Sequence, residues 1–148
     1  MKRQGTGDEQ RGEMYARYRD KIHKRDLSNT ENYDKALLTL SSATLGFSLT
    51  AIHSIIPFKT SDYTWLIITG WVLLLVSIIT SLAAFPVSNK ALSVQLKSAE
   101  DYYIDGKEDA FRRKNTFENI NKYLNYIAGL SFGIAIVAIM AFVILNVL

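Results

Sequence analysis

The sequence contains no cysteine, so it can form neither disulfides nor thiolate metal sites. It also lacks the short motifs of common enzymes: there is no H-E-x-x-H metal pair, no G-x-S-x-G nucleophile turn and no phosphate-binding loop. We therefore expect no catalytic activity, no metal site and no cofactor.

Charge is missing from three long stretches of the chain, 36–57, 63–85 and 127–148. Each stretch is long enough to cross a hydrocarbon core of about 30 Å, which takes about 20 helical residues. A soluble helical bundle is the alternative, but soluble helices normally keep a polar face, and the second and third stretches offer few polar side chains. The sequence predicts an all-α membrane protein with three transmembrane helices embedded in a lipid bilayer.

The Lys and Arg residues are distributed unevenly around these stretches. Of the seventeen in the chain, nine precede the first stretch, seven lie in 87–126, and only Lys59 lies between the first two stretches. Loops rich in Lys and Arg stay in the cytoplasm. We therefore expect a multi-pass membrane protein with a cytoplasmic N-terminus and the C-terminus outside.

Segment 1–34 is predicted to be a cytoplasmic, basic, amphipathic N-terminal segment, because apolar residues recur in it at helical spacing. Ser28 and Glu31 match a capping box, which predicts that the first membrane helix starts near Asn29. Segment 35–148 is predicted to form the three-span domain. Within it, the second and third helices extend into a cytoplasmic hairpin over 87–126 that turns at Asp105–Gly106.

Small and hydroxyl-bearing residues recur along all three predicted spans. The first span carries two such stripes on nearly opposite sides. One stripe consists of Thr39, Ser42, Gly46, Thr50 and His53, and the other of Ser41, Thr44, Ser48 and Ala51. The second span contributes Gly70, Ser77, Thr80, Ser81 and Ala84, and the third Gly129, Ser131, Gly133, Ala135 and Ala138.

Small residues let helix backbones approach closely, and hydroxyls form hydrogen bonds between helices. Three helices have few interior positions for so many such stripes, so we expect a homo-oligomer. The hydroxyls themselves have two interpretations. They either line a narrow, neutral path through the membrane or bond to carbonyls of their own helix.

His53 is the only Asp, Glu, Lys, Arg or His within the three stretches. It lies about one turn from the outer end of its span, where it either reaches the interface or senses pH. Proton-coupled transporters need buried acids or bases. The absence of an acid inside the stretches therefore argues against a secondary transporter.

Three consecutive cations, Arg112, Arg113 and Lys114, are candidates for binding a cytoplasmic protein partner or a small signalling ligand. Acidic residues are interspersed with the bases, and the net charge is only +3. Direct nucleic-acid binding needs a concentrated basic face, so we do not expect it.

The segment YDKALLTLSSATLG, residues 33–46, resembles the first span of small prokaryotic multi-span membrane proteins. The layout of the whole chain is similar to that of compact membrane effectors that accompany bacterial anti-phage systems. That resemblance implies an oligomer in the bacterial inner membrane that permeabilises or depolarises this membrane after a cytoplasmic trigger. The alternative hypothesis is a membrane anchor or adaptor whose helical stalk binds or restrains a partner protein.

Overall fold

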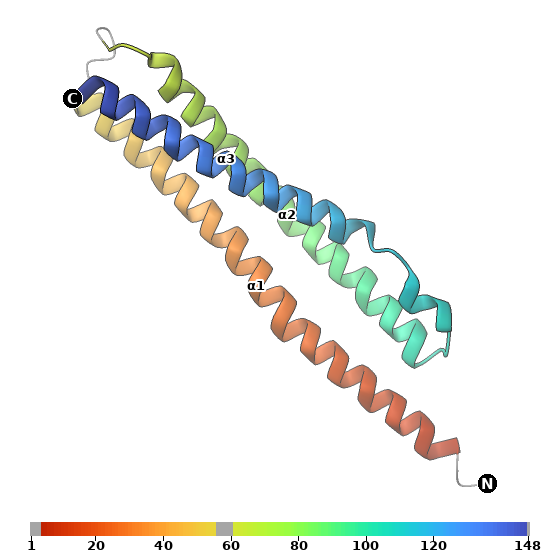
Figure 1. The fold of residues 1–148 in the computed structure, drawn as a ribbon. Helices are drawn as coiled ribbons and strands as arrows, with labels where there is room; N and C mark the ends of the chain where they lie inside the picture. Colours follow the sequence, from red (N-terminus) through yellow and green to blue (C-terminus); the bar gives the residue numbers. More distant parts are fainter. Residues whose placement is uncertain (1–3, 56–60, 148) are drawn as a thin grey trace. The chain divides into compact units, whose positions relative to one another are not determined.

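The computed structural model describes residues 4–55 and 61–147, and every regular element in that part of the chain is helical. Helix α1 spans Gln4–Ile55, α2 spans Thr64–Tyr103 and α3 spans Thr116–Val147, with a short 3₁₀ helix η1 at Glu108–Arg112 (Figure 1). The predicted all-α class is confirmed for the described residues.

Three of these helices are long and apolar enough to cross a membrane, over Glu31–Ile52, Thr64–Tyr103 and Thr116–Asn146. At a rise of 1.5 Å per residue, the 40 residues of α2 extend about 60 Å, roughly twice the thickness of a hydrocarbon core. The chain is therefore compatible with a multi-pass membrane protein, and α2 is long enough to continue well beyond the bilayer.

The helices divide between two compact units. The apolar unit comprises Tyr33–Ala84 and Lys122–Leu148, and the polar unit comprises Met1–Asn32 and Phe85–Asn121. Each of the three long helices contributes to both units.

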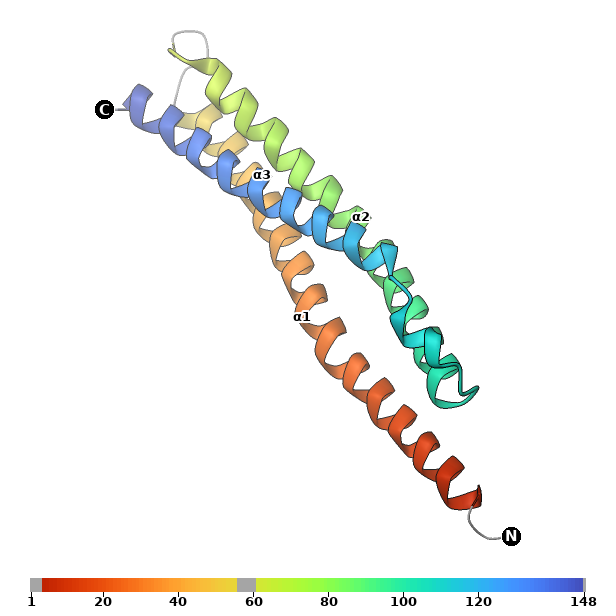
Figure 2. The same cartoon turned by 45° about the vertical axis from the view of Figure 1, so that its right-hand side comes forward.

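In the apolar unit, segments of α1, α2 and α3 run side by side (Figures 1 and 2). Their shared core consists of Ile52, Ile67, Leu74, Ala135, Ile139 and Phe142. The outside of the unit is also hydrophobic: Phe47 is 75% exposed and Val137 68% exposed. Large exposed apolar faces are rare on soluble monomers, so this surface suits contact with lipid.

At one end of the apolar unit, a side chain of α3 forms hydrogen bonds with the residues that precede α2. Asn146 donates to the backbone oxygen of Asp62 at 2.9 Å and accepts from the Asp62 backbone N–H at 2.8 Å. It also donates to the carbonyl of Phe142, one turn earlier in α3. This amide therefore joins the residues just before α2 to the end of α3.

The polar unit contains the connection between α2 and α3. Gly106 has φ +68°, a conformation that favours glycine, so the predicted turn at Asp105–Gly106 is present. After it come η1 and then an extended segment, 113–115. The Asn115 side chain accepts from the backbone N–H of Glu118 at 3.3 Å and thereby caps α3.

Two local expectations are wrong. Helix α1 is continuous from Gln4 to Ile55, so no new helix begins at the predicted capping box. A cap contributes only about 1 kcal/mol, and the helix continues where its residues can keep their backbone hydrogen bonds. The segment after Gly106 is also not a continuous helix, because η1 and 113–115 separate the turn from the start of α3 at Thr116.

Candidate functional site

One of the two stripes on the first span faces the other helices of the apolar unit. The Ser41 and Ser77 hydroxyls share a buried hydrogen bond of 3.0 Å between α1 and α2. Two turns further along, the Trp71 indole N–H donates to Ser48 Oγ at 2.9 Å. Ser48 in turn donates to the carbonyl of Leu45 in its own helix. These serines link α1 to α2.

The other residues of this stripe, and the small and hydroxyl-bearing residues of the second span, vary in burial. On α1, Thr44 is half-buried and Ala51 is exposed. Thr80 is half-buried, and its hydroxyl donates to the carbonyls of Val76 and Ser77 in its own helix. The other second-span positions are all buried, namely Gly70, Ser77, Ser81 and Ala84.

Helix α3 packs through its small residues, but not through both glycines. Ser131, Ala135 and Ala138 are buried. A Cβ added at Gly129 would lie 2.5 Å from the Tyr33 hydroxyl, whereas one added at Gly133 would meet nothing within 4 Å. The two glycines of the G-x-x-x-G match therefore have different surroundings.

The second stripe on the first span is exposed. Thr39, Ser42, Gly46 and Thr50 all lie on the surface of the apolar unit, and a Cβ at Gly46 would meet nothing within 4 Å. The Thr50 hydroxyl donates to the Gly46 carbonyl at 3.0 Å. His53 belongs to α1, but its side chain lies outside the described residues.

A carboxylate that the sequence prediction missed is buried in the apolar unit. Asp34 is only 1% exposed, and it lies within the candidate span Glu31–Ile52. The charge-free stretch at 36–57 begins just after it. The premise that the spans bury no acid is therefore wrong for this chain. A seven-residue spacing, Asp34–Ser41–Ser48, was the available signal, because such a spacing keeps residues on one face of a packed helix.

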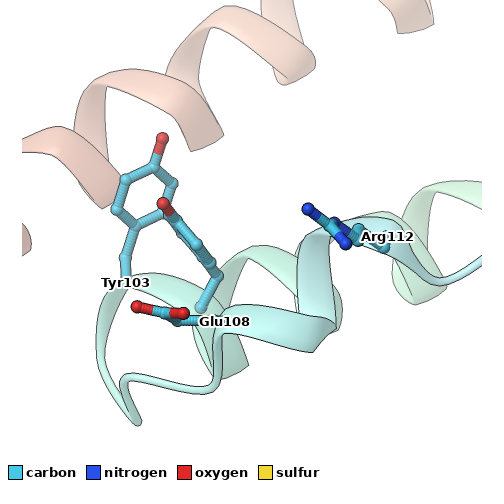
Figure 3. A pocket seen from close by; sticks show the side chains of 4 residues that line it. Tyr103, Glu108 and Arg112 are labelled. Carbon is cyan, nitrogen blue, oxygen red and sulfur yellow. The ribbon is translucent and has the colours of Figure 1, made fainter.

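The polar unit holds an open pocket of about 430 Å³ beside η1, lined by Tyr102, Tyr103, Glu108 and Arg112. Figure 3 shows the Tyr103 ring rising from α2 toward the ribbon of α1, with Glu108 at one end of η1 and Arg112 at the other. The Tyr103 ring lies 6.1 Å from that of Tyr18, centroid to centroid. The lining combines aromatic faces with one acid and one base.

An ion-pair network lies in the same unit, around the turn at Gly106. Asp101 accepts from Arg113 at 2.9 Å and from Lys107 at 3.3 Å, and Lys107 also donates to Asp105 at 3.0 Å. The bond to Asp105, followed by that to Asp101, raises the pKa of the Lys107 ammonium above its ordinary value.

The three consecutive cations therefore have three different surroundings. Arg113 is paired with Asp101, Arg112 lines the pocket, and Lys114 is exposed on the extended segment before α3. Within the part of the chain that the structure describes, no group of three or more His, Cys, Asp or Glu residues is placed to hold a metal ion.

Comparison of the chain with protein-family models, with curated proteins and with solved structures gives no significant match. A function for this protein must therefore be argued from its own residues.

Proposed function

We propose that the protein is an oligomeric inner-membrane effector that permeabilises or depolarises the membrane after a cytoplasmic trigger. In this proposal the N-terminus is cytoplasmic, α1 enters the membrane as an extension of a basic amphipathic segment, and the turn at Gly106 lies at the cytoplasmic tip of a hairpin. The layout that resembles anti-phage membrane effectors makes defence the biological setting we favour.

The observation that carries the proposal is the exposed stripe on α1, formed by Thr39, Ser42, Gly46 and Thr50. Hydroxyls and backbone that face hydrocarbon gain no hydrogen bonds from it, whereas a second helix packed on a small-residue face provides close contacts and hydrogen-bond partners. A second copy of the chain, docked through this stripe, would cover it. The same hydroxyls could then line a neutral path between copies.

The buried stripe is a weaker basis for a path. Ser41 and Ser48 already contact Ser77 and Trp71 within one chain. Opening a path there would break these hydrogen bonds and separate α1 from α2. Permeation between copies leaves the bonds within each copy intact.

Matched glycine substitutions test this proposal. Gly46 and Gly133 are both exposed, and both have open space where a Cβ would be added. We expect Gly46→Leu to abolish both oligomer formation in native mass measurements and dye leakage from liposomes, while Gly133→Leu retains both. Leakage and oligomer size that are unchanged in Gly46→Leu would contradict a contact through this stripe.

The adaptor hypothesis is favoured by a different observation, the open pocket beside η1. Its tyrosines and Arg112 could bind a protein partner or a small signalling ligand, and such binding would also serve as the trigger of an effector. Arg113 is a poor probe for this role, because its reversal would break the ion pair with Asp101.

Charge reversal at Arg112 and Lys114 separates the two hypotheses. The readout is growth arrest of cells that express the chain and receive the trigger. If the chain is an adaptor, Arg112→Glu with Lys114→Glu abolishes this arrest, whereas Gly46→Leu leaves it unchanged. If it is a permeabilising effector, Gly46→Leu abolishes arrest, and the charge reversals affect only the response to the trigger.

A further inference from the structure

Asp34 is an acidic residue buried in the apolar unit, where a charged side chain is energetically unfavourable. Its side chain is 1% exposed, and its Oδ1 has no hydrogen-bond donor. Removing an unpaired carboxylate from water costs so much free energy that buried carboxyls normally acquire a partner or a proton. Within a membrane, such a residue faces the interior of the bundle and usually serves a function.

Two further buried oxygens in the apolar unit also lack partners, Ser81 Oγ on α2 and Asn125 Oδ1 on α3. Buried polar atoms are almost always hydrogen-bonded, so each exception needs an explanation. Here the exceptions come from three different helices, which suggests one common cause.

The helix register places the residues that carry these oxygens within about one helical turn of one another along the bundle. The Ser41–Ser77 bond sets the antiparallel pairing of α1 with α2, and continuing it by seven residues places Asp34 opposite Ala84. Ser81 is three residues away from that level, about 4.5 Å along the axis. The Tyr33 hydroxyl donates to the backbone carbonyl of Asn125 at 3.5 Å. This bond places Asn125 beside the same turn of α1.

Among the residues that the structure describes, no ion pair involves Asp34. The α2 segment Thr64–Ala84 contains no Asp, Glu, Lys, Arg or His. On α3, Lys122, Tyr123 and Tyr126 are exposed, and Lys122 has an interaction of its own. On α1 itself, Lys35 is exposed and Glu31 half-buried, and both have interactions of their own. The candidate partners of the carboxyl at this level of the bundle are the Asn125 side-chain amide and the Ser81 hydroxyl.

We propose that Asp34 is a proton-binding site inside the apolar unit, where the carboxylic acid O–H donates to Asn125 Oδ1 and the Ser81 hydroxyl donates to the other carboxyl oxygen. The proton comes from water at the nearby end of the unit and returns there. Binding it converts three unsatisfied oxygens into a hydrogen-bonded set that carries no charge. Losing it leaves a carboxylate that must be hydrated, so α1 separates from α2 and α3 at this end as pH rises.

This site is independent of whether the protein permeabilises membranes. It predicts that packing of the apolar unit responds to pH through one residue. A proton also needs no cavity, whereas a metal cation needs room for several ligands around it.

Infrared spectroscopy of the full chain in lipid nanodiscs tests the proposal. We expect a carboxylic acid C=O band at neutral pH that shifts in D₂O and disappears as pH rises. Asp34→Asn should remove this band, while Asp62→Asn, which changes an exposed acid, should retain it. Asn125→Leu should shift the band, because the acid loses its acceptor but keeps its proton.

The measurements have outcomes that overturn the proposal. One is the absence of the band in the unmodified chain at every pH at which circular dichroism shows the helices intact. Another is a band that survives in Asp34→Asn. A third is a carboxyl spectrum that changes when NaCl replaces choline chloride at constant pH but does not change with pH at constant salt. That result would assign the site to a metal cation. Since the first and third use the unmodified chain, they hold even if Asp34→Asn fails to fold.

Discussion

The hydrogen bond between Ser41 and Ser77 makes the two serines energetically dependent on each other, because both hydroxyls are buried. Removing one hydroxyl leaves the other without its partner, which costs more than losing both groups together. This residue-scale coupling distinguishes a structural hydroxyl from one that faces lipid or a path.

We expect Ser41→Ala and Ser77→Ala each to lower the free energy of unfolding in micelles by about 0.5–2 kcal/mol. The double variant should lose less than the sum of the two, as a double-mutant cycle would show. Ser42→Ala, on the exposed stripe, is the matched control and should change monomer stability little. Strictly additive losses would mean that the two hydroxyls do not interact.

At the scale of the elements, the approach of α2 to α3 depends on Gly70. A Cβ there would lie 2.7 Å from Ile139 Cγ1 and 3.3 Å from the Ala135 carbonyl oxygen. Ile139 and the fully buried Phe142 belong to the same core cluster, so a shift of Ile139 to make room would disturb that packing.

Gly70→Ala should therefore destabilise the apolar unit by about 1–3 kcal/mol, as overpacking typically does. Gly133→Ala, with open space at its Cβ, should instead be neutral or slightly stabilising, since alanine favours helix. Unfolding in a denaturing detergent measures both. Equal effects of the two substitutions would contradict the close approach of α2 and α3 at Gly70.

The connection after α2 is a second element whose order depends on a few contacts. Asp101 binds both Lys107 and Arg113, so a single carboxylate joins the end of α2 to residues on either side of η1. Surface ion pairs are individually weak and screened by salt.

Asp101→Asn should make 104–115 more sensitive to limited proteolysis, and high salt should have the same effect on the unmodified chain. Asp109→Asn, an exposed acid on η1, provides the control. If the Asp101 and Asp109 variants are cleaved at the same rate, the network does not order this segment.

At the scale of the whole molecule, the proposed orientation is a prediction about which residues face which side of a membrane. The chain has no cysteine, so a single introduced cysteine is an unambiguous probe. Ser61, before α2, and Lys114, before α3, should face opposite sides if three helices cross the bilayer.

We expect Ser61→Cys to react with an impermeant maleimide in intact cells, and Lys114→Cys to react only after the membrane is permeabilised. Gly7→Cys should behave like Lys114→Cys, because both positions are proposed to be cytoplasmic. If the reagent instead reaches Gly7→Cys and Ser61→Cys from the same side, the first helix does not span the membrane.

The sequence by itself determined the helical class, the three apolar segments and the turn at Gly106. Hydrophobicity over 20 residues, and the ease with which glycine adopts positive φ, are properties of a segment and need no partner. The capping-box signal at Ser28 failed because it is equally local but weak, and the continuity of α1 overrode it.

Only the tertiary structure decided which stripe of the first span is buried. On an isolated helix, the stripes through Ser41 and Ser42 are similar in kind, because both consist largely of small and hydroxyl-bearing residues. They differ once the helices pack, because Ser77 and Trp71 on α2 form hydrogen bonds with Ser41 and Ser48 of one stripe. The same docking covers Asp34, a residue that its position in the sequence assigns to the charged end of a helix. A residue is buried only where a neighbouring helix packs against it, and the sequence of one helix does not specify that neighbour or its register.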